Sequence, residues 1–127
     1  MEKTYSVEIT ETSIEELSKR DRVMLKDTGD AIALDETLPD GVDETLEIEV
    51  KDYAILSVHN EKAEDKDYTK YIILAPNGTK YVTGSESFFK SFMDIYTEMA
   101  PDAFSIKVYK KPSNNFKGKF FLSCSIL

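Results

Sequence analysis

Apolar and polar residues alternate along several stretches of the chain, and this period of two is typical of strands with one buried face. The clearest case is TYSVEIT, residues 4–10, where Tyr5, Val7 and Ile9 fall on one side. A longer stretch, residues 46–62, predicts a long or bent strand. The pattern predicts a protein built mainly from strands.

Two pairs of predicted strands are separated by short turn sequences, so each pair is expected to form a hairpin. Residues 68–75 and 79–83 flank a Pro-Asn-Gly turn. Residues 103–111 and 119–126 flank a second loop that is rich in Pro, Ser, Asn and Gly. These hairpins account for most of the second half of the chain.

The segment SESFFKSFMDIYTEMAP has the period of a helix instead of a strand. Its apolar face comprises Phe88, Phe92, Ile95, Tyr96 and Met99. Ser85 or Thr83 is suited to cap the first turn, and Pro101 ends the helix. The aromatic residues of this face are expected to belong to the core.

The segment between the first strand and residue 46 is less regular. Thr12 and Glu15 have the spacing of a capping box, which predicts one or two helical turns over residues 12–20. A short hairpin around the sequence DTGD is expected to carry Met24, Leu25, Ile32 and Leu34. Residues 35–45 are acidic, contain Pro and Gly, and predict a loop.

The predicted order from residue 46 is strand, strand, strand, helix, strand, strand. One helix between the third and fourth of five strands is the order of an OB-fold, a barrel that binds oligonucleotides through a strand face and adjoining loops. We therefore expect a single domain over residues 1–127, mainly β. Residues 46–127 would form a five-stranded OB-fold-like barrel, and residues 1–45 would be strand and hairpin additions to it.

Charge is distributed unevenly along the 127 residues, whose net charge is −8. Residues 1–66 hold 8 basic and 19 acidic side chains, whereas residues 67–127 hold 8 basic and 5 acidic ones. The stretch KVYKKPSNNFKGKFF, residues 107–121, has five lysines, four aromatic residues and no acid. The overall charge argues against a general nucleic-acid binder, but this stretch is a candidate site for an anionic partner.

Alternation within the strand 103–111 separates a core side from an outward side. The core side comprises Phe104, Ile106 and Val108, and the outward side comprises Lys107, Tyr109 and Lys111. Lysines neutralise phosphates and unpaired bases stack on aromatic rings, which is the combination that single-stranded nucleic acid requires. The neighbouring strands and the loop 110–119 contribute further lysines and aromatic residues. The full predicted set is Lys107, Tyr109, Lys111, Phe116, Lys117, Lys119, Phe121, Lys70 and Lys80.

Purely structural roles for these residues stay open beside the binding role. Lysines on exposed strands also discourage edge-to-edge aggregation, and Tyr109 can simply pack against lysine stems. Phe116 can fold back onto the barrel, and Tyr71 and Tyr81 can belong to the core. The acidic segment 35–52 is a further hypothesis: it would compete with DNA for the cationic face.

Residues for enzymatic chemistry are sparse. His59 is the one histidine, so no Ser-His-Asp or Cys-His set can be assembled, and neither CxxC nor HExxH occurs. We therefore expect no enzyme, no metal and no cofactor. Cys124 is the one cysteine and lies in a strand-like segment, which predicts a buried, unreactive thiol. No apolar leader or membrane-spanning run occurs, so an intracellular protein is expected.

The chain resembles a family of small single-stranded DNA-binding proteins from phages of Gram-positive bacteria. The resemblance is carried by MEKTYSVEITET, RVMLKDTGDAIALDE, YAILSVHNEK, YVTGSESFFKSFMDIYTEM and KKPSNNFKGKFFLSCSI. It implies protection of single strands during phage replication or recombination in the cytoplasm of an infected or lysogenic bacterium. Single-stranded DNA is then the expected partner, with phage or host replication proteins as further partners, no membrane, and an oligomeric state that a homodimer would fit.

A second hypothesis comes from the other half of the chain. The acidic N-terminal half would be the working surface of a protein-interaction module that binds a basic host or phage protein. Affinity for a basic protein without affinity for oligonucleotides would distinguish it from the first hypothesis.

Overall fold

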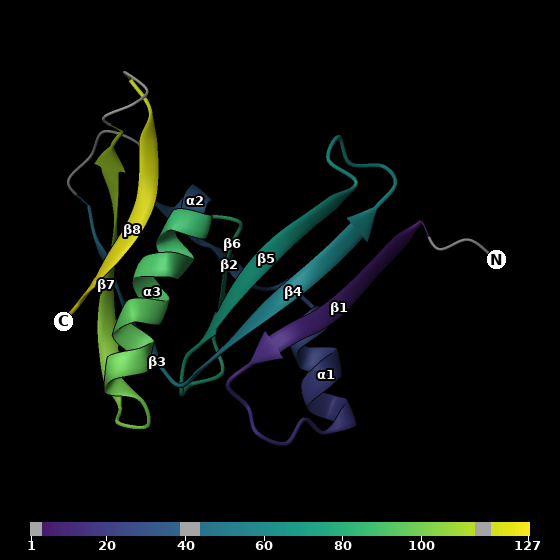
Figure 1. Cartoon of the computed structure of the whole chain (residues 1–127), viewed down its shortest axis with the longest axis horizontal. Coiled ribbons are helices and arrows are strands. Elements are labelled where there is room, and N and C mark those ends of the chain that lie inside the picture. Colours follow the sequence, from purple (N-terminus) through teal and green to yellow (C-terminus); the bar gives the residue numbers. More distant parts are fainter. Residues whose placement is uncertain (1–3, 39–43, 114–117) are drawn as a thin grey trace.

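The computed structural model describes residues 4–38, 44–113 and 118–127, which form two sheets and three helices (Figure 1). The strands are β1 (Tyr5–Thr12), β2 (Ile32–Ala33), β3 (Leu46–Val50), β4 (Asp52–Asn60), β5 (Asp67–Leu74), β6 (Lys80–Thr83), β7 (Phe104–Pro112) and β8 (Phe120–Ile126). The helices are α1 (Lys19–Lys26), α2 (Leu34–Thr37) and α3 (Glu86–Met99). Sheet A has the strand order β1-β4-β5-β6-β2, and sheet B has the order β3-β7-β8. The prediction of a mainly β protein with one helix between later strands is confirmed.

The predicted long or bent strand is a bent pair that joins the two sheets. β3 pairs with β7 in sheet B, and after Lys51 the chain continues as β4, which pairs with β1 and β5 in sheet A. Ile48 and Val50 of β3 are buried while Glu47 and Glu49 are exposed, so one face of β3 is in contact with solvent. The bend therefore carries the chain from a half-exposed sheet into a more deeply covered one.

Both predicted hairpins are confirmed. β5 and β6 pair antiparallel around a turn in which Gly78 has φ +90°, a conformation that favours glycine. The Gly78 amide donates to the Ala75 carbonyl at 3.0 Å, and the Thr79 amide donates to the Asn77 side chain at 3.0 Å. β7 and β8 pair antiparallel from Ile106 opposite Ile126 to Pro112 opposite Phe120.

Helix α3 is confirmed with its Ser85 cap, whose Oγ accepts from the Phe88 amide at 3.2 Å. Phe88 and Phe92 are fully buried, as the helical pattern predicts. Their cluster includes Ile73 of sheet A and Ile106 of sheet B, so α3 helps to close the core between the two sheets. Figure 1 shows α3 running beside β8 and β7.

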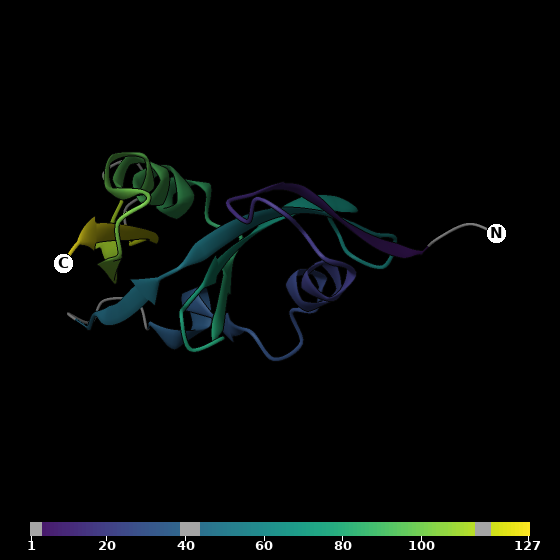
Figure 2. The same cartoon turned by 90° about the horizontal axis from the view of Figure 1, so that it is seen from below.

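A second core lies on the other face of sheet A, beneath α1 (Figure 2). Leu25 of α1 packs with Leu56 and Ile72 of the sheet. The predicted helical turn capped by Thr12 is wrong, because Thr12 is the last residue of β1 and pairs with Ala54 of β4. Its hydroxyl donates to the Tyr53 carbonyl at 2.8 Å. The helix begins after Ser18 instead. Ser18 and Asp21 form the capping box at 3.0 and 3.1 Å.

The predicted hairpin around DTGD is also wrong. Met24 and Leu25 belong to α1, Ile32 belongs to the two-residue β2, which pairs parallel with β6, and Leu34 begins α2. Leu34 is fully buried in the core between the sheets, so tertiary burial takes this segment away from a local hairpin. Of the predicted loop 35–45, residues 35–37 belong to α2, and residues 39–43 lie outside the described part of the chain.

The predicted closed barrel is wrong. Within the described residues β6 pairs with β5 and β2, and β8 pairs with β7, so no pairing joins sheet A to sheet B at this side. Residues 5–33 supply both edge strands of sheet A. Among the described residues, no helix is long and apolar enough to cross a membrane.

Candidate nucleic-acid interface

The outer side of sheet B gathers cationic and aromatic side chains from two neighbouring strands. The β7–β8 register pairs Lys107 with Ser125, Tyr109 with Ser123 and Lys111 with Phe121, so all of these lie on one side of the sheet. Lys119 lies two residues before Phe121 and is exposed. We call this surface the cationic-aromatic face; it comprises Lys107, Tyr109, Lys111, Lys119 and Phe121. The alternate residues Ile106 and Val108 are fully buried on the opposite side.

Tyr109 is held in place by hydrogen bonding on this face. Its hydroxyl lies 2.7 Å from the Ser125 Oγ, and this hydrogen bond lowers the pKa of the phenol. The Lys111 Nζ lies 5.4 Å from the ring centroid, within cation–π range. The ring is half-buried and Ser123, opposite it in the register, is buried. A ring with its orientation already set loses less entropy when a base stacks on it.

Phe121 adds a second aromatic ring to the face. It lies directly opposite Lys111 and is diagonal to Tyr109, which corresponds to roughly 7–8 Å between Cα atoms. Its side chain is 38% exposed, unlike Phe88 and Phe92. Bases can stack on the faces of these two rings, and the ammonium group of the neighbouring Lys111 can contact a phosphate.

Lys107 has an acidic neighbour on its other side. Glu47 of β3 is its partner in the β3–β7 register, and Glu49 lies opposite Ser105. Both glutamates are exposed. The hypothesis of an acidic competitor named only the segment 35–52. The alternation in LEIEV could have identified Glu47 and Glu49 as outward-facing, but not their register against β7.

Lys70 and Lys80 lie away from the cationic-aromatic face, in sheet A. Lys80 is 7% exposed, and its Nζ donates to the carbonyls of Met24, at 2.8 Å, and Asp27. It also lies 3.3 Å from a carboxylate oxygen of Asp30. Its ammonium thus caps the carbonyls at the end of α1, and Lys80 has a structural role instead of a place in the site.

Lys70 is closer to the surface but belongs to the same neighbourhood. Its Nζ donates to the Thr28 hydroxyl at 3.3 Å and lies 5.9 Å from the Tyr68 ring centroid. The sequence prediction grouped these lysines with residues 107–121 because it did not recognise α1. The helix packs on this side of sheet A.

The remaining sequence-predicted residues have different outcomes. Phe116 and Lys117 lie outside the described residues. Tyr71 stacks on Phe89 with centroids 4.3 Å apart, and Tyr81 packs against the same core, so core packing accounts for both. Cys124 is buried as predicted, and burial raises the pKa of its thiol to about 12.

A separate charged cluster lies near the turn between β4 and β5. His59 Nδ1 lies 2.7 Å from an Asp67 oxygen, and Nε2 lies 2.6 Å from a Glu61 oxygen. Lys66 pairs with the other Glu61 oxygen at 3.2 Å. The hydrogen bonds to Asp67 and Glu61 raise the pKa of His59. No group of three acidic, histidine or cysteine side chains in the described residues is arranged to hold a metal ion.

Comparison of the chain with protein-family models, curated proteins and solved structures finds no significant match. Function is therefore inferred from the side chains and their geometry.

Proposed function

We propose that this protein binds single-stranded DNA, without sequence preference, through the cationic-aromatic face of sheet B. The observation that carries the proposal is the β7–β8 register, which brings Tyr109, Lys111 and Phe121 together on an exposed side of the sheet. Lysine side chains neutralise phosphates and aromatic rings stack on bases of any sequence. Duplex DNA keeps its bases stacked internally, so it can use the lysines but not the rings.

Each residue of the face has a role in this proposal. Tyr109 and Phe121 stack on successive bases, and Lys111 and Lys119 contact the phosphates between and beside them. Lys107 adds charge at the border with β3, where Glu47 weakens its effect. Phe116 and Lys117 stay predictions from the sequence.

The order of elements supports an open relative of the OB-fold. The bent β3–β4 segment pairs with β5 at one end and β7 at the other, and α3 separates β6 from β7. The side of β5 and β6 beneath α1 is covered by that helix, so it has no role in the proposed binding. With the resemblance to phage single-strand binders, this arrangement favours a non-enzymatic role in phage replication or recombination.

Fluorescence anisotropy with labelled oligo-dT, compared with duplex DNA of equal length at two salt concentrations, tests the proposal. We expect binding to the single strand to be tighter and to weaken steeply with salt. Replacing either ring, Tyr109→Ala or Phe121→Ala, should cost about 1–3 kcal/mol of binding free energy.

Tyr5→Ala is the matched control, because Tyr5 is an exposed aromatic residue, 50% accessible, on the edge strand of sheet A. It should bind oligo-dT like the wild type. Wild-type affinity in both Tyr109→Ala and Phe121→Ala would show that the site is wrong, and equal affinity for duplex and single strand would contradict stacking.

A further inference from the structure

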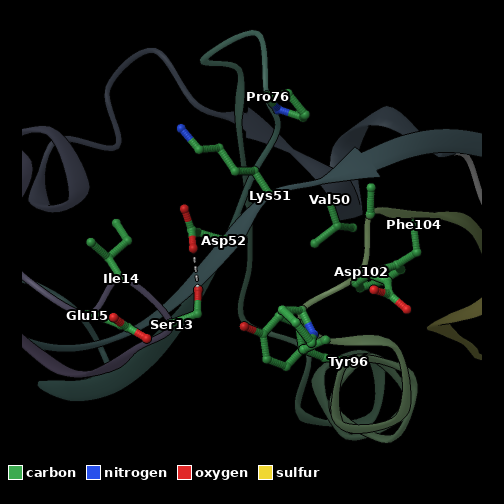
Figure 3. Close-up of a pocket in the computed structure, with 13 residues that line it drawn as sticks. Ser13, Ile14, Glu15, Val50, Lys51, Asp52, Pro76, Tyr96, Asp102 and Phe104 are labelled. Carbon is green, nitrogen blue, oxygen red and sulfur yellow. Dashed lines mark hydrogen bonds between the residues drawn. The ribbon is translucent and has the colours of Figure 1, made fainter.

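A cavity of about 630 Å³ lies where β3 passes into β4, beside the end of α3 (Figure 3). Its walls come from the loop after β1, the bend at residues 50–52, and the segment 100–104 that leads into β7. The volume is typical of sites that accept small molecules or a few side chains. The cavity adjoins the start of β7, and none of its lining residues belongs to the cationic-aromatic face, so the two surfaces are distinct.

The charges around this cavity are mainly negative. Glu15, Asp52 and Asp102 contribute carboxylates, and Lys51 contributes the one ammonium group. Asp52 accepts a hydrogen bond from the Ser13 hydroxyl at 2.9 Å. Glu15 and Asp102 are exposed, and neither belongs to an ion pair within the described part of the chain. In Figure 3 the Lys51 side chain extends away from Tyr96 and Asp102.

The rest of the lining is apolar and aromatic. Ile14, Val50 and Phe104 line the cavity with Tyr96, whose hydroxyl points into it in Figure 3. The Tyr96 ring is held edge-on against Phe104, with centroids 6.2 Å apart. An aromatic ring and carboxylates that line one cavity suit a planar cation, because guanidinium stacks on ring faces and donates two parallel hydrogen bonds to a carboxylate.

We propose that this acidic cavity docks an arginine-bearing segment of a basic partner protein. The guanidinium lies against Tyr96 and donates to Glu15 or Asp102, and a neighbouring apolar side chain of the partner packs on Ile14 and Val50. The net charge of −8 steers a basic partner toward the protein. This inference goes beyond the proposed function, and because the two surfaces are separate, one molecule can hold DNA and the partner together.

The probe is a fluorescein-labelled nine-residue peptide of alternating arginine and leucine, measured by anisotropy at low salt. Its counterpart carries citrulline, the uncharged isostere, in place of arginine. We expect the arginine peptide to bind at least about tenfold more tightly than the citrulline peptide. Equal affinity for the two peptides would overturn the proposal, since guanidinium recognition is its central claim.

The test variant is the double substitution Glu15→Gln and Asp102→Asn, which removes two exposed carboxylates. It should weaken binding of the arginine peptide by about tenfold. The control is Glu64→Gln with Asp65→Asn, the same change of charge in the turn between β4 and β5. It should stay within about twofold of the wild type. Equal losses in both double variants would overturn the proposal in favour of general charge attraction.

Two further readouts separate this inference from the proposed function. Wild-type amide resonances of residues 13–15, 100 and 102–104 should shift when the arginine peptide is added, and shifts confined to other regions would overturn the docking site. The Glu15→Gln, Asp102→Asn variant should keep its oligo-dT affinity within about twofold. Joint loss of peptide and oligo-dT binding would count against a local site.

Discussion

Two strand surfaces of this protein carry lysines beside tyrosines, yet they meet different environments. On sheet A, Lys80 lies beneath α1 and its ammonium is bonded to carbonyls of that helix. On sheet B, Lys111 is exposed beside Tyr109 and Phe121. The same residue types in the same strand pattern thus become a structural cap or a binding surface according to what packs over them.

Removing the buried lysine should have the largest effect. Lys80→Met should lower the free energy of unfolding by about 2–4 kcal/mol, because the carbonyls of Met24 and Asp27 at the end of α1 lose the ammonium that donates to them. Urea denaturation measures this change. Lys111→Met is the matched control and should change stability by no more than about 0.5 kcal/mol. Comparable stability losses in the two variants would break the distinction between the two surfaces.

Neutralising the exposed lysine should affect binding instead of stability. Lys111→Gln should weaken oligo-dT binding by about threefold to fivefold at low salt and reduce the salt slope by about 0.7, since one phosphate contact is lost. Lys62→Gln, an equal charge change in the exposed turn after β4, should leave the slope unchanged. A slope that falls equally in both variants would indicate diffuse attraction.

Glu47 should limit the cationic-aromatic face because it lies opposite Lys107. Glu47→Gln should raise oligo-dT affinity by about twofold to fourfold at low salt, because the Glu47 carboxylate is negative and repels the phosphates of the bound strand. Glu8→Gln, on the exposed side of β1, is the control and should change affinity less. If oligo-dT affinity does not rise, Glu47 does not limit binding at the cationic-aromatic face.

The smallest expected effect concerns pH. The raised pKa of His59 means that its ion pairs stabilise the fold below about pH 6.5, and that this contribution is lost as pH rises through the raised value. An NMR titration of the ring should show this pKa. Asp67→Asn should lower it, whereas Asp65→Asn should not. A wild-type pKa at or below 6.5 would contradict the double hydrogen bond.

The same titration sharpens the contrast between the sheets. The His59 cluster lies on sheet A, outside the cationic-aromatic face. Oligo-dT affinity should therefore not follow the protonation of His59 between about pH 6 and 8. An affinity that tracks the His59 titration would extend the DNA site to the turn between β4 and β5.

Local patterns predicted the elements whose determinants lie close together along the chain. The Pro-Asn-Gly turn with Gly78 specifies the β5–β6 hairpin, and the Ser85 cap with its apolar stripe specifies α3. Alternation alone separated Ile106 and Val108 from Tyr109, since neighbouring strand residues point to opposite sides. These parts of the fold and of the candidate site depend on interactions within a few residues.

In other segments the sequence pattern is compatible with more than one local structure, and contacts with distant residues determine which one forms. Thr12 and Ser18 both have capping-box spacing. Thr12 is the last residue of β1, where it pairs with Ala54 of β4, whereas Ser18 caps α1. Burial of Leu34 in the core likewise replaces a local hairpin with β2 and α2.

By itself, the sequence determined β1, the two hairpins β5–β6 and β7–β8, the main helix α3 and the outward direction of Tyr109 and Lys111. Only the tertiary structure decided that Lys80 is covered, that Glu47 faces Lys107 and that the two sheets do not close into a barrel. The physical reason is range: periodicity and caps act over a few residues, whereas covering a lysine or setting a register depends on residues tens of positions away.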